Sequence, residues 1–139
     1  MKPGTVNICG IPYTVEYVDH VAKVTKEPRP CSGGIDLVKR EIRILDKDRP
    51  VQAVWHTLLH ETLHGISRDL YLVIGDESYH DQLDQLALAL MDLLFRNGIV
   101  NENTPLPGKG LVISRADLEA LSPRKRAEFF SNGGRVTKR

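Results

Sequence analysis

Residues 57–65 read Thr57-Leu58-Leu59-His60-Glu61-Thr62-Leu63-His64-Gly65, and both the expected fold and the expected site are organised around this stretch. Apolar side chains recur at helical spacing before and after it, which predicts a helix from about Val51 to Ile66. His60 and His64 point away from the centre of its apolar face and are therefore available for chemistry. The core face of this helix is expected to consist of Val51, Val54, Trp55, Leu58, Thr62 and Ile66.

The two histidines of this helix are four residues apart, which indicates a metal site. Side chains at this spacing lie one above the other, so the ring nitrogens of His60 and His64 can converge on one ion. Zinc accepts neutral imidazole readily and prefers about four ligands. Glu61 points to a different side of the helix, where it can reach a water on the metal and take its proton. We therefore predict Zn²⁺ as cofactor, His60 and His64 as metal ligands, and Glu61 as the catalytic base.

A third protein ligand is expected on a second helix, predicted from about Glu77 to Arg96 and closed by Asn97-Gly98. His80 is the first candidate, because imidazole is a good zinc ligand and this residue borders the apolar stripe of the helix. Asp84 is one turn further on, where it would either orient the His80 ring or bind the metal itself. Glu77 and Asp81 are further candidates. The stripe is expected to hold Leu83, Leu86, Ala87, Leu90, Leu93 and Leu94.

Other polar residues near this motif have two possible roles each. His56, one turn before His60, is expected either to contact substrate or stabilise an oxyanion, or to be merely solvated. Tyr71 and Tyr79 would either donate a hydrogen bond to an oxyanion or pack against the core. Residues 71–74 are short and apolar, which is typical of a strand or a buried loop. His20 has no visible partner in the sequence.

The residues before the helix predict a small sheet. Residues 6–9 and 13–18 alternate in period two and indicate a β-hairpin, and residues 41–45 indicate a further strand. Residues 27–30 and Ser32-Gly33-Gly34 are predicted to form a loop. Asp48 would cap the helix, with Pro50 in its first turn. The expected fold is α+β: a short antiparallel sheet, hairpin plus strand, packed on two main helices.

The distribution of charge predicts two parts. Residues 1–103 hold 11 Lys/Arg against 15 Asp/Glu, whereas residues 104–139 hold 8 against 3, so a mildly acidic domain would precede a basic tail. Within the tail, Ser114 and Ser122-Pro123 predict the starts of two short helices. The formal net charge of +1 favours neither nucleic acid nor a membrane as partner. The basic cluster 124–126 is expected to be a solvated helix face.

Composition also bears on the compartment. No apolar run approaches the roughly 18 residues that a membrane span needs, and the N-terminus lacks the apolar core of a secretory signal. We therefore expect cytoplasmic residence. Cys9 and Cys31 form no C-x-x-C pair, so two free thiols packed as small hydrophobic groups are expected.

The stretch 57–65 resembles the zinc helix of small phage-type and ImmA/IrrE-like HExxH metallopeptidases, which are minimal gluzincin-like zincins. The segments 10–15 and 41–44 fit the hairpin and strand that precede this helix in the family. Leu83-Asp84-Gln85-Leu86-Ala87 is similar to the "V-D/E-x-L-A" segment of its returning helix. The resemblance covers about residues 5–100. It implies a glutamate as third ligand, and the matching position here holds Asp84, with His80 one turn earlier.

This resemblance implies a zinc-dependent peptidase that acts on a protein or peptide in the cytoplasm of a bacterial or phage-infected cell. The substrate backbone would pair with an exposed edge of the strand at 41–45. An alternative from another functional class is a catalytically inactive, zinc-stabilised module that binds a protein partner through the basic tail 104–139. Nucleic-acid binding through residues 124–126 is a weaker third hypothesis.

Overall fold

The computed structural model describes residues 4–24, 31–108, 112–131 and 134–136, so the predicted loop at 27–30 lies outside the described residues. Strands β1 (Thr5–Ile8) and β2 (Ile11–Val18) form an antiparallel hairpin, as predicted. The turn between them has positive φ at both Cys9 (50°) and Gly10 (81°), which two-residue hairpin turns favour. Cys9 is therefore exposed on the turn rather than packed, whereas Cys31 is half-buried.

The sheet has four strands and is mixed, so the prediction of an antiparallel hairpin plus one strand was wrong. The strand order is β1-β2-β4-β3, with β3 at Gly33–Asp36 and β4 at Glu41–Leu45. After β2 the chain passes through a 3-10 turn, η1 (Val21–Lys23), and β3, and only then returns alongside β2. Strand β4 consequently runs parallel to β2 and antiparallel to β3. The broader prediction of an α+β fold is confirmed.

Two further expectations about these strands were wrong. The sequence Ser32-Gly33-Gly34 was expected to be a loop, yet Gly33 and Gly34 pair with β4. The strand at 41–45 was expected to present an exposed edge, yet β4 lies between β2 and β3. The residues Ile42 and Ile44 are fully buried, as befits an internal strand. The sheet edge on this side is therefore β3, which in the described part of the chain pairs with β4 alone.

Helix α1 (Val51–Asp69) follows β4 and lies against the sheet. Its N-cap residue is Pro50, and Asp48 lies two residues earlier in a left-handed turn (φ 57°), so the prediction that Asp48 caps the helix was wrong. Arg49 stabilises the first turns of α1 instead. Its guanidinium donates to the carbonyl oxygens of Leu45 and Ala53 and to the hydroxyl of Thr57, which ties β4 to α1.

The buried face of α1 is rotated from the predicted one. Val54, Trp55 and Leu58 are buried as expected. Three predicted core residues are only half-buried, because the sheet covers a neighbouring stripe of the helix instead. That stripe, Thr57, Glu61 and Gly65, is buried. The half-buried predicted core residues are Val51, Thr62 and Ile66.

Gly65 explains how close the helix and the sheet come. A Cβ on Gly65 would lie 2.9 Å from Cδ1 of Ile8 and 3.3 Å from Cδ1 of Ile35. The glycine thus admits side chains from β1 and β3 rather than ending the helix, and α1 continues to Asp69.

The segment after α1 differs from both predictions for residues 71–74, a strand or a buried loop. It forms an exposed turn and two 3-10 turns, η2 (Val73–Gly75) and η3 (Glu77–Tyr79), rather than a strand or a buried loop. Helix α2 then spans His80–Arg96 and begins three residues later than predicted. It ends at Asn97, with Gly98 in the left-handed conformation (φ 67°), as the closing pair predicted.

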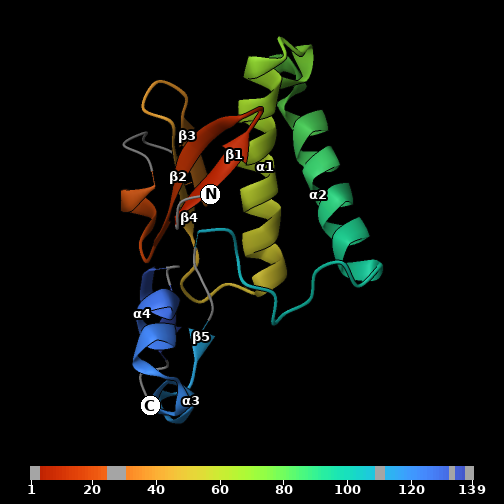
Figure 1. The fold of residues 1–139 in the computed structure, drawn as a ribbon. Coiled ribbons are helices and arrows are strands. Elements are labelled where there is room, and N and C mark those ends of the chain that lie inside the picture. Colours follow the sequence, from red (N-terminus) through yellow and green to blue (C-terminus); the bar gives the residue numbers. More distant parts are fainter. Residues whose placement is uncertain (1–3, 25–30, 109–111, 132–133, 137–139) are drawn as a thin grey trace.

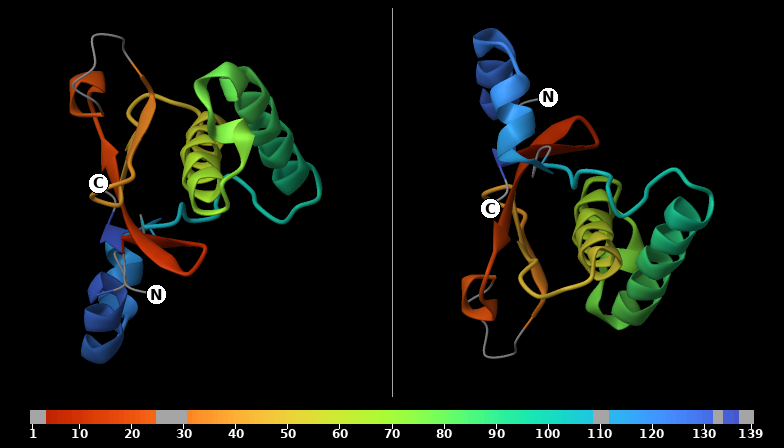
Figure 2. Two further views of the ribbon diagram at one scale, coloured as in Figure 1. Left: turned by 90° about the horizontal axis from the view of Figure 1, so that it is seen from above. Right: turned by 90° about the horizontal axis from the view of Figure 1, so that it is seen from below.

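Helix α1 lies between the sheet and α2, so the sheet packs on one main helix rather than two (Figure 1; Figure 2). Because α2 contacts α1 along one side only, Leu83 and Ala87 are its buried residues. Leu86 and Leu93 of the predicted stripe are exposed on the outer side.

The chain after α2 returns to the core before it forms the tail. Val100 and Leu106 are buried in the main hydrophobic cluster, so packing of the first unit extends past residue 103. The tail then forms β5 (Val112–Ile113), α3 (Arg115–Ala120), α4 (Pro123–Ser131) and β6 (Arg135–Val136), with β5 and β6 parallel. As predicted, hydroxyls of Ser114 and Ser122 accept from backbone N–H groups at the two helix starts. Within the described residues, no helix combines the length and apolar character that crossing a bilayer requires.

Candidate metal centre

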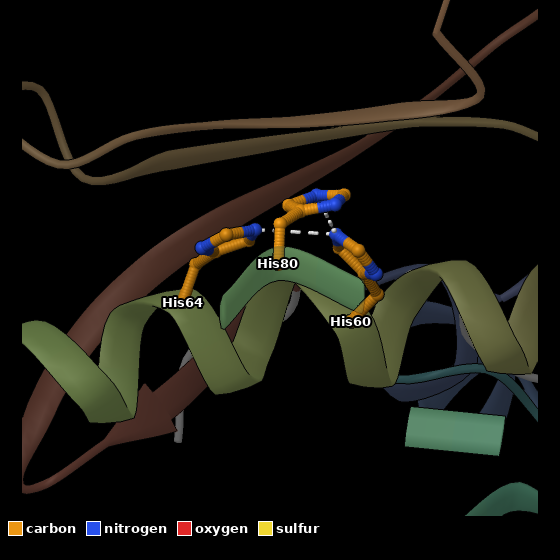
Figure 3. A group of neighbouring side chains, drawn as sticks. All are labelled: His60, His64 and His80. Atoms are coloured by element: carbon orange, nitrogen blue, oxygen red, sulfur yellow. Dashed lines mark hydrogen bonds between the residues drawn. The ribbon is translucent and has the colours of Figure 1, made fainter. Parts of the chain in front are cut away.

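Three histidine side chains from two helices converge on one point. His60 and His64 come from the middle of α1, and His80 is the first residue of α2. Nε2 of His60 lies 3.1 Å from Nε2 of His64 and 3.1 Å from Nε2 of His80. The three rings turn toward one another, and their ligand atoms all lie within 4.8 Å of each other (Figure 3). This cluster could hold a metal ion.

The distances from Nε2 of His60 to the other two ring nitrogens fit a single small ion. Ligands at about 2.1 Å from a tetrahedral ion are about 3.4 Å apart, close to the observed Nε2–Nε2 distances. The start of α2 makes this possible: η2 and η3 fold the chain back so that His80 faces the third and fourth turns of α1. Of the candidates for a third member, the structure brings His80 into the group and leaves out Glu77, Asp81 and Asp84.

Asp84 instead lies behind His60. Its Oδ1 is 2.8 Å from Nδ1 of His60, a contact in which Nδ1–H donates and the carboxylate accepts. The other ring nitrogen, Nε2, then has its lone pair free on the side of the cluster. The sequence placed Asp84 one turn from His80 and suggested that it orients that ring. The ring it contacts belongs to the other helix, which spacing along one helix does not reveal.

The same Asp84 oxygen also faces His56, at 3.1 Å from Nε2. Burial opposes ionisation of the Asp84 carboxyl, but the hydrogen bond from His60 and the neighbouring imidazoles outweigh it and hold its pKa below the ordinary value. His56 lines the same groove as the cluster. Of its two expected roles, simple solvation does not describe this position, since the side chain is only 26% exposed.

Burial favours the neutral form of the two imidazoles on α1. It lowers the pKa of His60, although the Asp84 carboxylate opposes the change. It lowers the pKa of His64 to about 4, assisted by the neighbouring His60 and His80. Metal binding requires the neutral imidazole, so near pH 7 protons compete weakly for the ring nitrogens of His60 and His64.

Glu61 is buried beside the cluster, with 7% of its surface exposed. Burial raises the pKa of its carboxyl to about 7. The carboxyl lies against β3, because a Cβ on Gly33 would be 3.0 Å from Oε1 of Glu61 and 2.4 Å from Cγ2 of Thr57. A glycine at position 33 therefore leaves the space that Glu61 occupies. This is a functional signal that sequence reasoning missed when it assigned the Gly-Gly pair to a loop.

A groove of about 1150 Å³ runs between β3 and the helices. Its lining includes Gly33, Gly34 and Ile35 from β3, and the groove passes the three histidines and Glu61. Neither Tyr71 nor Tyr79 lines it, so the structure does not bring these tyrosines to the site. His20 lies elsewhere, where its Nδ1 accepts from the backbone N–H of Ala22 at the start of η1.

The chain matches no family model, no curated protein and no solved structure. The fold and the site together describe a small α+β protein with a mixed four-stranded sheet and a three-histidine cluster that could hold a metal ion.

Proposed function

We propose that this chain is a zinc-dependent peptidase with a zincin-like domain. In this proposal His60, His64 and His80 hold the ion, and Glu61 is the catalytic base. The observation that carries the proposal is the convergence of three imidazoles beside one buried glutamate of raised pKa, all lining one groove.

The donor set favours zinc, and it favours a catalytic site over a structural one. Imidazole nitrogen suits zinc, whereas calcium and magnesium prefer oxygen. Structural zinc sites fill all four positions with protein groups, but catalytic sites use three and leave the fourth to water or substrate. Among the described residues the group has three members, and the nearby Asp84 carboxylate is engaged by His60. A position for substrate therefore remains.

Zinc in such a site supplies a Lewis acid that polarises a carbonyl and makes a water molecule more acidic. Glu61 accepts the proton of the attacking water on a carboxylate oxygen and then donates it to the nitrogen of the departing amine. A pKa of about 7 suits a group that must take and release one proton near neutral pH. Asp84 keeps the His60 ring in one tautomer while this happens.

Strand β3 is the element that would position a peptide. It is the sheet edge beside the groove, and Gly33 and Gly34 leave its backbone accessible. An extended substrate can add to such an edge through main-chain hydrogen bonds, which places a peptide carbonyl over the histidines. This role replaces the one expected for the strand at 41–45, which is internal.

The proposal is tested by metal analysis and proteolysis of purified protein. We expect one zinc per chain and zinc-dependent cleavage of unfolded casein. Glu61→Gln should retain zinc but lose activity about 100-fold or more, whereas the matched change at exposed Glu102, Glu102→Gln, should have no effect. Full activity of Glu61→Gln would refute the proposed mechanism. Zinc-loaded protein without any hydrolysis would favour the alternative, a zinc-stabilised binding module that uses its tail.

A further inference from the structure

Four consecutive apolar residues between α1 and α2 are exposed. They are Leu70, Tyr71, Leu72 and Val73, which we call the apolar loop, with 55%, 94%, 46% and 64% of their surfaces exposed. Single exposed apolar residues are common, but a run of four that includes a nearly bare tyrosine marks an interaction surface. The loop caps the end of the α1–α2 pair that lies away from the tail helices α3 and α4 (Figure 1). The described tail therefore does not cover it.

The backbone holds this loop in one conformation. The N–H of Tyr71 donates to the carbonyl of Arg68 (3.2 Å), and the N–H of Leu72 donates to that of Ser67 (2.8 Å). Gly75 packs on Ser67 so closely that a Cβ would lie 2.6 Å from Cβ of Ser67. Tyr71 has a backbone φ of 54°, a conformation that residues other than glycine rarely adopt. Strain of this kind persists where surrounding contacts enforce it, and here it presents a tyrosine to solvent.

Charge around the loop indicates what it contacts. Of the charged residues from 68 to 81, the exposed ones are Arg68 and three acids, Asp76, Glu77 and Asp81. The exposed charges that flank the loop in the sequence are thus mostly acidic, which disfavours the anionic surface of a lipid bilayer and favours a protein segment that carries basic side chains.

The loop also lies close to the groove in the chain, because Gly75 and Glu77, two and four residues beyond Val73, line the groove. We propose that the apolar loop is a docking site for an apolar and basic segment of the protein substrate, beyond the residues that lie along β3. That the partner is a substrate rests on the proposed peptidase function. The docking surface itself rests on exposure, backbone geometry and charge.

The test measures binding in the Glu61→Gln background, so that the probe is not cleaved. Two fluorescein-labelled 20-residue peptides of equal apolar content serve as probes, one with lysines and one with glutamates at the polar positions. We expect the double change Tyr71→Ser with Val73→Ser to weaken binding of the lysine peptide about tenfold. Ile99→Ser is the matched control, because Ile99 is 62% exposed at the other end of α2. It should leave the affinity unchanged.

Three results would overturn the inference: equal affinity of the double variant and its parent, equal binding of both peptides, or loop-dependent capture on phosphatidylcholine vesicles. Zinc content and circular dichroism of the double variant establish that it is folded. Cleavage of the lysine peptide by zinc-loaded wild-type protein is measured in parallel. Binding that depends on the loop, without cleavage, would refute the peptidase function and support the docking site. Cleavage together with binding that does not depend on the loop would support the peptidase function and refute the docking site.

Discussion

Oδ1 of Asp84 lies 2.8 Å from Nδ1 of His60, and this contact joins α2 to the histidine motif of α1. It fixes the His60 ring so that Nε2 faces His64 and His80. A residue that orients a metal ligand in this way typically contributes about 10- to 100-fold to metal affinity.

Asp84→Ala should therefore weaken zinc affinity by about 10- to 100-fold without abolishing it. His80→Ala should weaken it further, because it removes a donor from the group. Competition with a chromophoric chelator measures both affinities. Asp92→Ala is the matched control, since Asp92 is exposed on the same helix and pairs with Arg96. If Asp84→Ala loses zinc as completely as His80→Ala, Asp84 is itself a ligand.

The two glycines of β3 offer a second prediction. Gly33→Ala would place Cβ 2.4 Å from Cγ2 of Thr57 and 3.0 Å from Oε1 of Glu61, so the strand or the glutamate must move. We expect a loss of about 1–3 kcal/mol in the free energy of unfolding, as for overpacking elsewhere. Gly34→Ala is the control, because its Cβ would meet atoms of Val24 no closer than 3.4 Å. Urea unfolding measures both variants, and equal effects would contradict the close approach.

These glycines also show how much of the fold can be predicted from the sequence. The spacing of His60 and His64 predicts that they share a face of α1, because helix geometry is local. The hairpin β1–β2 is likewise local, and its alternation is visible in the sequence. Strand β3 is short and begins with two glycines, so its local signal is that of a loop, and only pairing with β4 makes it a strand. The order β1-β2-β4-β3 depends on that non-local pairing.

The third histidine illustrates the same limit within the site. Residue type and helix position make His80 the first candidate and leave Asp84 open as an alternative ligand, because the sequence does not show which of the two faces α1. Their roles depend on how η2 and η3 turn the chain between the two helices. That turn directs His80 into the cluster and Asp84 to the far side of the His60 ring.

Two groups contribute opposite pH dependences to the stability of the metal-free protein: the buried Glu61 and the half-buried His64. The folded-state pKa of Glu61 is raised to about 7, so between pH 4.5 and 7 the folded chain holds a proton that the unfolded chain has lost. Stability therefore falls in this window as the pH rises. The folded-state pKa of His64 is lowered to about 4, so between pH 4 and 6.5 the unfolded chain holds the extra proton, and stability rises with pH. The two effects oppose each other.

Glu61→Gln removes the first effect. Metal-free Glu61→Gln should be more stable than the metal-free parent above pH 7, by up to about 3 kcal/mol, since one pKa unit corresponds to about 1.4 kcal/mol. The difference should shrink toward zero near pH 4, where Glu61 is protonated in both states. Urea unfolding at pH 4, 5.5 and 8 measures it. A difference that does not change with pH would show that Glu61 is ionised in the folded state.

The end of the first unit can be located by truncation, because Leu106 is 7% exposed in the main hydrophobic cluster. The carbonyl of Pro107 accepts a hydrogen bond from the hydroxyl of Tyr17 on β2. A chain that ends at residue 103 loses both contacts, and we expect it to lose about 3 kcal/mol or more of stability, as when a buried leucine is cut back to alanine. A chain that ends at Gly108 keeps both contacts and should lose less than about 1 kcal/mol, because its remaining changes are at the surface.

Urea unfolding of the metal-free chains compares the two lengths without a contribution from zinc binding. Leu106→Ala in the full-length chain is the matched point change, and it should account for most of the loss seen on truncation at 103. Equal stability of the chains that end at 103 and 108 would return the boundary to residue 103, the position that the distribution of charge indicates. A large loss on truncation at 108 would instead show that the tail elements α3 and α4 stabilise the sheet.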